Sequence, residues 1–184
     1  MEPIVTERLI LREFNGDDIE EVHQYASDPE VTKYMVWSPN SKKQTKKFVE
    51  ERIEQQNQTI RKDYDLAITL KSDGLIGACG IDDIKLSNKK GELGYCLNKQ
   101  YWEKGYATET SEALLDLGFN DLELHRIFAK CDTKNLQSKN VLGKIGMEQE
   151  GILREHKIID GRWRSSYIYS ILEGEYSKIQ ENHL

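Results

Sequence analysis

Proline and cysteine are scarce in this sequence, and long hydrophobic runs are absent from it. Only 3 of the 184 residues are Pro, while 38% are hydrophobic and 32% are charged, a composition typical of an ordered globular chain. No apolar run approaches the roughly 20 residues of a membrane-spanning helix, and the start, MEPIVTERL, has no apolar signal segment. We therefore expect a cytoplasmic protein with no membrane partner.

The three cysteines, Cys79, Cys96 and Cys131, are an odd number and lie far apart in strand-like runs. This spacing fits neither a disulfide framework nor a metal site, so we expect buried free thiols in a reducing compartment and no bound metal.

The chain also lacks an excess of basic residues. With 32 Asp plus Glu against 26 Lys plus Arg, the net charge is −6. Nothing in this charge balance therefore favours a nucleic-acid backbone as the main partner, and we expect no direct nucleic-acid partner.

Hydrophobic alternation and turn residues predict one α+β domain over residues 1–184, with a mixed sheet. The expected strands cover 6–14, 64–70, 75–84, 92–97, 126–132, 147–159 and 163–172. The expected helices cover 19–26, which Asp17 or Asp18 can cap, and 41–59, 107–119 and 135–145. Trp163, Tyr167 and Tyr169 share one face of the last strand, which predicts that they lie in the core.

Residues 92–109 form the stretch that indicates chemistry: a strand, a loop that ends at Gly105, and a helix. A helix start offers unpaired backbone N–H groups and the positive end of the helix dipole, which suit a pyrophosphate. Gly105 lets the backbone approach a ligand closely, and Lys104 adds positive charge. The sequence has neither G-x-x-x-x-G-K-[ST] nor an opening G-x-G-x-x-G, so P-loop and dinucleotide sites are excluded.

This stretch resembles the GNAT superfamily of N-acetyltransferases, whose central motif is [QR]-x-x-G-x-[GA] after the fourth strand. Gly105 and Ala107 fill the last two positions, while Trp102 stands where Gln or Arg is usual. The form W-x-K-G-Y-A-T-E is typical of the RimJ/RimL-like branch, the ribosomal-protein N-terminal acetyltransferases. Three further segments are similar to that branch: 6–12 (TERLILR), 135–147 (Asn-x-x-Ser to Lys-Ile-Gly-Met) and 150–163 (Glu-Gly-x-x-Arg to Gly-x-Trp).

The resemblance implies the GNAT fold, a mostly antiparallel seven-stranded sheet with helices on both faces, splayed between its fourth and fifth strands. It implies acetyl-coenzyme A as cosubstrate, with no metal. The pantetheine chain would lie in the gap against the backbone of Tyr95, Cys96 and Leu97. The expected pyrophosphate contacts come from the loop and helix start, Glu103, Lys104, Gly105, Tyr106, Ala107 and Thr108, and the expected contacts from the later helix are Asn135 and Ser138.

Acetyl transfer to an amine needs a neutral nucleophile, yet an N-terminal amine has a reference pKa near 8 and a lysine near 10.4. The resemblance implies Glu92 as the base, because it stands where the histone acetyltransferase branch has a catalytic glutamate. Many GNAT enzymes place a Tyr seven residues after the motif Asn to protonate the departing thiolate. Here that position is Leu142, and Ser138 is the expected substitute. The glutamate that RimL-type enzymes carry on the next strand is replaced by Lys157 or its neighbour His156.

The expected function is therefore acetyl transfer to a primary amine, in the first place a protein N-terminal α-amine, by direct attack on the thioester. Two alternatives stay open: a small-molecule amine acceptor (a polyamine, amino acid or aminoglycoside), and an acetyl-coenzyme A-binding module without catalysis. The acidic balance suits a cationic acceptor of any kind and does not separate them. Monomer and homodimer are both compatible with the sequence.

Overall fold

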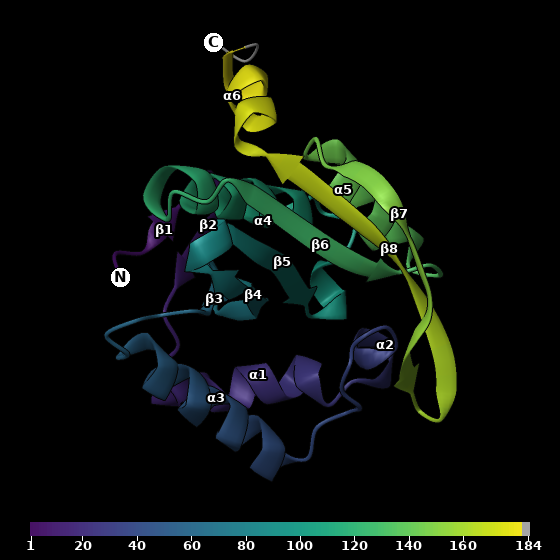
Figure 1. Ribbon diagram of the computed structural model, residues 1–184. Coiled ribbons are helices and arrows are strands. Elements are labelled where there is room, and N and C mark those ends of the chain that lie inside the picture. The colour runs from purple at the N-terminus through teal and green to yellow at the C-terminus, as the bar shows by residue number, and fades with distance from the viewer. Residues whose placement is uncertain (182–184) are drawn as a thin grey trace.

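Eight strands form a single sheet in the computed structural model, which describes residues 1–181 (Figure 1). The strands, in chain order, are β1 (Ile4–Val5), β2 (Leu9–Arg12), β3 (Tyr64–Leu70), β4 (Leu75–Lys85), β5 (Lys90–Leu97), β6 (Arg126–Asp132), β7 (Glu148–Ile159) and β8 (Arg162–Leu172). Their order across the sheet is β1-β2-β3-β4-β5-β6-β8-β7, and every neighbouring pair is antiparallel except β5 and β6. The mixed, mostly antiparallel sheet is confirmed. The eighth strand is the two-residue β1, which precedes the seven that were expected.

Residues 1–181 also form six α-helices. They are α1 (Ile19–Ala26), α2 (Pro29–Thr32), α3 (Lys42–Gln56), α4 (Tyr106–Asp116), α5 (Leu136–Lys144) and α6 (Glu173–Glu181). Ser41 caps α3 reciprocally with Gln44, which fixes its start. Sequence reasoning missed α6, whose apolar residues are few; Tyr176 anchors it by stacking on Phe119, with ring centroids 4.9 Å apart.

The helices cover both faces of the sheet. On one face α1 and α3 pack on the sheet through a cluster that includes Phe14, Val22, Val49 and Cys96. The opposite face packs against α4 and α5, through a larger cluster. This larger cluster includes Leu114, Ile127, Cys131 and Leu142. Because side chains alternate along a strand, Cys96 belongs to the first cluster and its neighbour Tyr95 packs against the second.

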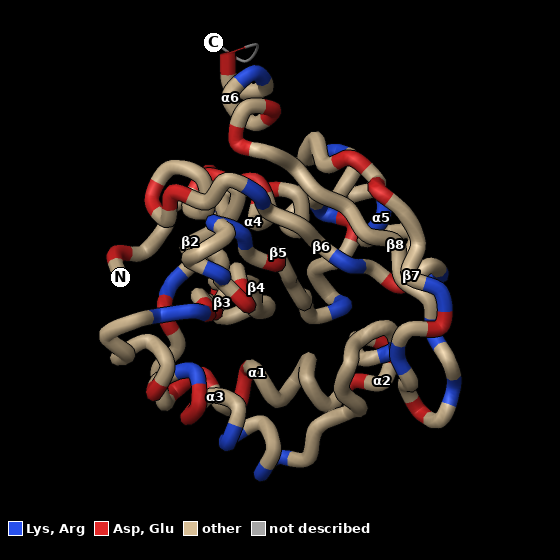
Figure 2. The backbone as a smooth tube through the Cα atoms, viewed as in Figure 1, with Lys and Arg blue, Asp and Glu red and all other residues tan. Residues whose placement is uncertain are grey.

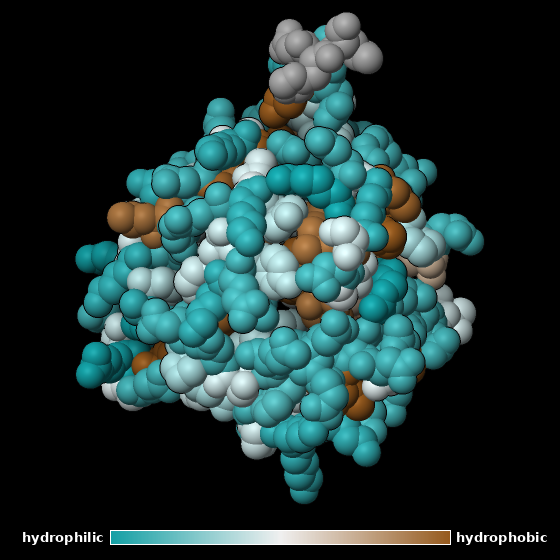
Figure 3. Space-filling model, turned by 180° about the vertical axis from the view of Figure 1, so that it is seen from behind, coloured by the Kyte–Doolittle hydropathy of each residue, from teal (hydrophilic) through white to brown (hydrophobic). Residues whose placement is uncertain are grey.

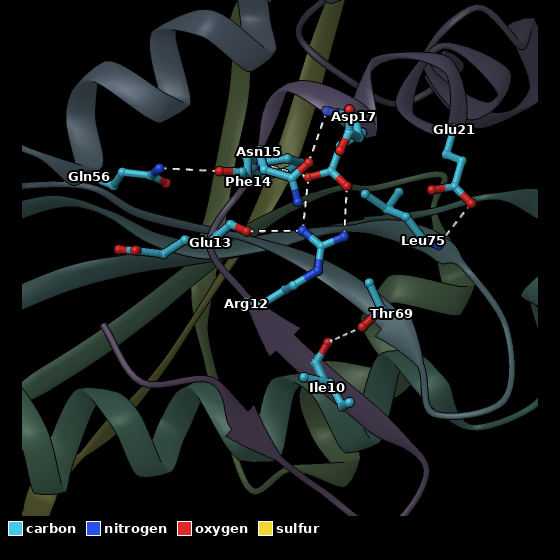
Figure 4. Close-up of polar contacts among 11 residues, drawn as sticks. Ile10, Arg12, Glu13, Phe14, Asn15, Asp17, Glu21, Gln56, Thr69 and Leu75 are labelled. Carbon is cyan, nitrogen blue, oxygen red and sulfur yellow. Dashed lines mark hydrogen bonds and ion pairs between the residues drawn. The ribbon is translucent and has the colours of Figure 1, made fainter.

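Polar contacts tie the sheet to the α1 and α3 layer (Figure 4). The Arg12 guanidinium donates to both carboxylate oxygens of the buried Asp18, at 2.9 and 2.7 Å. Gln56, at the end of α3, donates to the backbone oxygen of Phe14 at 3.2 Å. A bidentate Arg–carboxylate pair has a fixed geometry, so these contacts set the position of α1 over the sheet.

The surface seen from behind is mostly hydrophilic, with hydrophobic side chains in small separate groups (Figure 3). No described helix is long and apolar enough to cross a membrane. All three cysteines are buried, as expected. The prediction for Trp163 was wrong: it is 60% exposed, while Tyr169 is only 4% exposed. Trp163 lies near the turn of the β7–β8 hairpin, which extends past the body of the sheet (Figure 1).

Candidate active site

A gap opens between β5 and β6. In the described part of the chain the two strands pair only through Lys90, Gly91 and Glu92, opposite Arg126, Ile127 and Phe128. On its other side β5 is paired with β4 up to Leu97. The edge of β5 beyond Glu92 therefore faces an opening, and Figure 1 shows the two strands diverging. This is the splay expected from the resemblance.

The backbone groups on this free edge can be assigned from alternation. The Asn98 N–H donates to the Ile76 oxygen on β4 at 2.8 Å, so the N–H and C=O groups of Leu97 and Tyr95 point to the opposite side, into the gap. The Cys96 carbonyl points toward β4 instead, close to Gly77. The expectation for Cys96 is thereby corrected. The Leu97 carbonyl already accepts from the Trp102 indole N–H at 2.8 Å. Of Tyr95, Cys96 and Leu97, Tyr95 therefore has the backbone groups that are most available to a ligand in the gap.

The loop before α4 presents its backbone in an unusual conformation. Glu103 and Gly105 both have positive φ, +61° and +82°. Gly105 is the N-cap of α4, and no described side chain caps this helix start. The N–H groups of Tyr106, Ala107 and Thr108 therefore form an uncapped helix terminus, which is suited to an anion.

A group of contacts that sequence reasoning missed holds this helix start in place. Glu109 accepts from the Thr6 hydroxyl at 2.6 Å, from the Arg8 backbone N–H at 2.8 Å and from Arg8 Nε at 2.7 Å. Arg8 Nη1 donates to the Lys104 carbonyl at 2.9 Å. Burial raises the pKa of Glu109, but these hydrogen bonds outweigh burial and lower it. Residues 6–8 (Thr-Glu-Arg) and residues 107–109 (Ala-Thr-Glu) therefore lie side by side in the fold.

The start of α5 lies beside the same loop, since Gln137 donates to the Glu103 carboxylate at 3.1 Å. Asn135 caps α5 by accepting from the Ser138 N–H at 3.1 Å, so its side chain is engaged in the helix. The Ser138 hydroxyl accepts from the Tyr95 hydroxyl at 3.2 Å. Ser138 is thus brought to the gap next to Tyr95, whose pKa burial raises to about 12. Leu142 is 1% exposed and belongs to the core.

Glu92 stands at the closed end of the gap, on the opposite face of the sheet from Tyr95. Its carboxylate forms an ion pair with Lys130 of β6 at 2.8 Å, and both side chains are about a third exposed, at 29% and 33%. Neither Glu92 nor Lys130 is therefore shut off from solvent or from a ligand.

Asp82 lies directly opposite Glu92 on β4. One of its carboxylate oxygens is buried without a hydrogen-bond donor among the described residues. Burial raises the pKa of Asp82 to about 7, and the nearby carboxylates of Asp65, Asp63 and Glu92 raise it as well, while Arg52 lowers it. Arg52 forms an ion pair with Asp65 at 3.0 Å. This acidic side of Glu92 was not expected from the sequence, because two adjacent aspartates, 82 and 83, give no sign of which one is buried.

The other side of Glu92 is basic. Arg164 of β8 pairs with the buried Asp132 of β6 at 2.7 Å, and Lys157 of β7 lies opposite Arg164. His156 Nε2 contacts the Ser166 hydroxyl at 2.9 Å. Burial and the charges of Lys157 and Lys130 lower the pKa of His156 below its usual value. Figure 2 shows residues of both charge signs along β6 and the β7–β8 hairpin.

The sequence profile of the family described as Acetyltransferase (GNAT) domain matches residues 8–148. The chain belongs to the GNAT acetyltransferases. An uncharacterized N-acetyltransferase, p20 of Bacillus licheniformis, is 36% identical over 96% of this chain and 99% of its own length. The crystal structure of a GNAT-family acetyltransferase from Bacillus anthracis is 33% identical, with a TM-score of 0.84 over 94% of this chain and 99% of that one.

Two more distant proteins of the family differ from each other in the acceptor that their names state. The spermidine N(1)-acetyltransferase of Escherichia coli is 24% identical over 90% of this chain and 87% of its own length. RimL, a ribosomal L7/L12 alpha-N-protein acetyltransferase crystallised with coenzyme A, is 19% identical, with a TM-score of 0.83 over 93% of this chain and 98% of that one. The second likeness shows the fold alone.

The protein is thus an acetyltransferase with acetyl-coenzyme A as cosubstrate, and the described residues fit that molecule. The open edge of β5 offers the Tyr95 backbone to a pantetheine chain, in the manner of an added strand. The uncapped start of α4 offers N–H groups to phosphates. Among the described residues no group of three or more His, Cys, Asp or Glu side chains is arranged to hold a metal ion.

Proposed function

We propose that this acetyltransferase transfers the acetyl group to a primary amine, in the first place the α-amine of a peptide or protein N-terminus, by direct attack on the thioester. The observation that carries the proposal is the position of Glu92. It marks the point where β5 and β6 separate, and it faces the α1 and α3 side of the sheet, while Tyr95 and Ser138 lie on the other. An amine that approaches from the Glu92 side would meet a thioester held in the gap.

Glu92 receives the proton that the amine must lose. An N-terminal amine has a reference pKa near 8, so most of it is protonated at pH 7. Most amines that reach the site must therefore lose a proton to the base before they attack. The ion pair with Lys130 orients the carboxylate. Asp82, directly opposite and with a pKa near 7, can hold the proton after Glu92 and so returns Glu92 to its charged form.

At the sulfur end, the Ser138 hydroxyl donates to the departing thiolate. Ser138 accepts from Tyr95, so its own hydrogen can be donated, and the buried Cys131 thiol is the other described group in its reach. A thiol has a reference pKa of about 8.5, so a single hydrogen bond is sufficient help for this leaving group.

The direct test is the release of coenzyme A, measured with peptide amides whose N-termini are free and with the same peptides acetylated at the N-terminus. Release that requires the free α-amine supports the proposal. Release with an acetylated peptide that contains lysine would move the acceptor to a side-chain amine. If acetyl-coenzyme A binds but no coenzyme A is released with any amine, the protein would be a binding module without catalysis.

A further inference from the structure

Lys157 is a half-buried cation without a partner. Its position on β7 faces Arg164, another cation, across the hairpin. Among the described residues its ammonium group has no hydrogen bond, ion pair or ring contact. Burial lowers the pKa of Lys157, and the charges of Arg164 and Lys130 lower it further, against the opposing effect of Asp132. A partly buried charge of this kind costs stability until a counter-charge arrives.

The other charged groups on this side of the site neutralise one another. Lys130 pairs with Glu92 at 2.8 Å, and Arg164 pairs with Asp132 at 2.7 Å. The lowered pKa of His156 keeps that ring neutral at pH 7. Among the described residues Lys157 is therefore left without an ion pair of its own, and the carboxylates that act on it, Asp132 and Glu92, are each paired with another cation.

The acidic side of Glu92 has the opposite balance. Asp63, Asp65 and Asp82 gather there around Arg52 and Arg61, and Arg61 is also paired with Glu13. The strand order β3-β4-β5-β6-β8-β7 thus runs from three aspartates, through the Glu92–Lys130 pair, to Lys157. The site is electrically polar along the sheet, and a ligand bound across it would be favoured if its own charges were arranged in the opposite sense.

We infer that the acceptor carries a carboxylate near its amine, and that Lys157 binds this carboxylate while the amine lies at Glu92. The inference rests on the proposed function and names the class of acceptor. A polyamine carries only positive groups, so it would leave Lys157 unpaired and would be repelled by it. A carboxylate removes the cost of the buried ammonium and forms a charge-assisted hydrogen bond with it.

The position of Lys157 also indicates how far the carboxylate lies from the amine. Lys130 is the cation that touches Glu92, whereas Lys157 lies opposite Arg164, beyond Asp132 along the sheet. β6 and β8 lie between the strand of Glu92 and the strand of Lys157, and neighbouring strands are about 4.8 Å apart, so an α-carboxylate directly beside its amine spans less than this separation. An acidic side chain on the first or second residue of a peptide reaches farther.

The test compares acceptors that differ by one charge. Initial rates of coenzyme A release are measured with tetrapeptide amides that begin Ser-Glu or Ser-Gln, with free glutamate, and with spermidine. We expect kcat/KM about tenfold higher for the Ser-Glu peptide than for the Ser-Gln peptide, as one gained charge pair implies. Lys157→Gln should abolish this ratio, and Lys157→Arg should retain it. Lys71→Gln, the same charge change at an exposed turn between β3 and β4, should leave it unaltered.

Melting temperature and acetyl-coenzyme A affinity are measured for each variant, and the wild-type ratio tests the inference even where a variant fails to fold. Equal rates with the two peptides, or a preference for spermidine, would overturn the inference and leave the transferase function standing. Fastest release with free glutamate would support the carboxylate and identify its source as a small molecule. No release with any acceptor, while acetyl-coenzyme A still binds, would overturn the proposed function and this inference with it.

Discussion

Asp82→Asn should stabilise the protein, and the gain should grow as the pH rises. Asp82 is largely buried among carboxylates, and one of its oxygens has no donor among the described residues. Asparagine has nearly the same shape as the protonated acid but cannot ionise. The substitution therefore removes the cost of the charge and preserves the packing.

The sign of this pH dependence follows from the linkage between folding and proton binding. The pKa of Asp82 is raised from 3.8 to about 7 in the folded protein, so folding favours the protonated form. The stability contributed by this proton is fully present below the unfolded pKa and is lost as pH rises through about 7. Asp82→Asn keeps that stability at every pH, because no proton is involved.

The shift in the pKa of Asp82 also sets the size of the change in stability with pH. Between pH 5 and the folded pKa lie about two pH units, and each is equivalent to ~1.4 kcal/mol, which sets a ceiling near 3 kcal/mol. Asp82 is not fully enclosed, and solvent screening reduces the effect. We therefore expect the advantage of Asp82→Asn over the wild type to grow by about 1–2 kcal/mol between pH 5 and pH 8.5.

Urea unfolding at pH 5 and pH 8.5 measures this difference directly, because the midpoint and slope give the free energy of unfolding at each pH. The matched control is Asp83→Asn, the same change one residue along. Asp83 is exposed and its hydrogen bond with Lys85 lowers its pKa, so its ionisation is complete throughout this range. Parallel pH curves for wild type and Asp82→Asn would refute the buried, proton-binding role of Asp82.

Three further changes test the active site. Gly105→Ala should weaken acetyl-coenzyme A binding, as measured by calorimetry. Its control is Gly161→Ala, where φ is similarly positive (+71° against +82° at Gly105), which should carry the same backbone strain and leave the affinity unchanged. Equal losses of affinity in the two variants would refute the phosphate role of the α4 start. Glu92→Gln should lower turnover by about 10²–10⁴-fold and flatten its rise with pH, so an unaltered pH–rate profile would assign the base to another group. Ser138→Ala should lower kcat about tenfold without changing the Michaelis constant for acetyl-coenzyme A. Tyr95→Phe, which removes the partner hydroxyl and leaves that of Ser138, is its control; a tenfold loss of kcat in Tyr95→Phe as well would show that Ser138 acts only through Tyr95.

Elements with strong local patterns were predictable from the sequence. β3 and β6 were predicted to the residue, because alternation and flanking turn residues define both ends. The start of α3 was readable from Ser41 and Gln44, whose reciprocal capping is a local interaction. The short β1 escaped prediction because it exists only through its pairing with Ile10 and Leu11 of β2.

The candidate site was predictable where it depends on position along one strand or helix, and not where it depends on contacts between distant segments. Glu92 at the last paired residue of β5 and Gly105 at the start of α4 follow from local pattern and resemblance. The contacts from Thr6 and Arg8 to Glu109 span about a hundred residues of sequence, and no periodicity reveals them.

The direction of the backbone groups on β5 is a further feature that the sequence alone does not predict. A strand alternates its N–H and C=O groups as well as its side chains, so three consecutive residues cannot all face the same gap. Which residues do so depends on the neighbouring strand, and here one hydrogen bond, from Asn98 to Ile76, decides it. Tyr95 and Leu97 face the gap, and the side chain of Trp102 then takes the Leu97 carbonyl.

The resemblance implies that Lys157 or its neighbour His156 stands where a glutamate is expected, and the surroundings of Lys157 are visible only in the fold. In the sequence it is one basic residue in a strand with charges of both signs. In the fold, the register of β7 on β8 shifts between Leu153 and Lys157, and this shift sets Lys157 opposite Arg164. Arg164 and Lys130 each have a carboxylate of their own, whereas the ammonium of Lys157 has no ion pair among the described residues. On the inference drawn above, a ligand carboxylate pairs with this ammonium group, and the expected acceptor is therefore an amine accompanied by an acid.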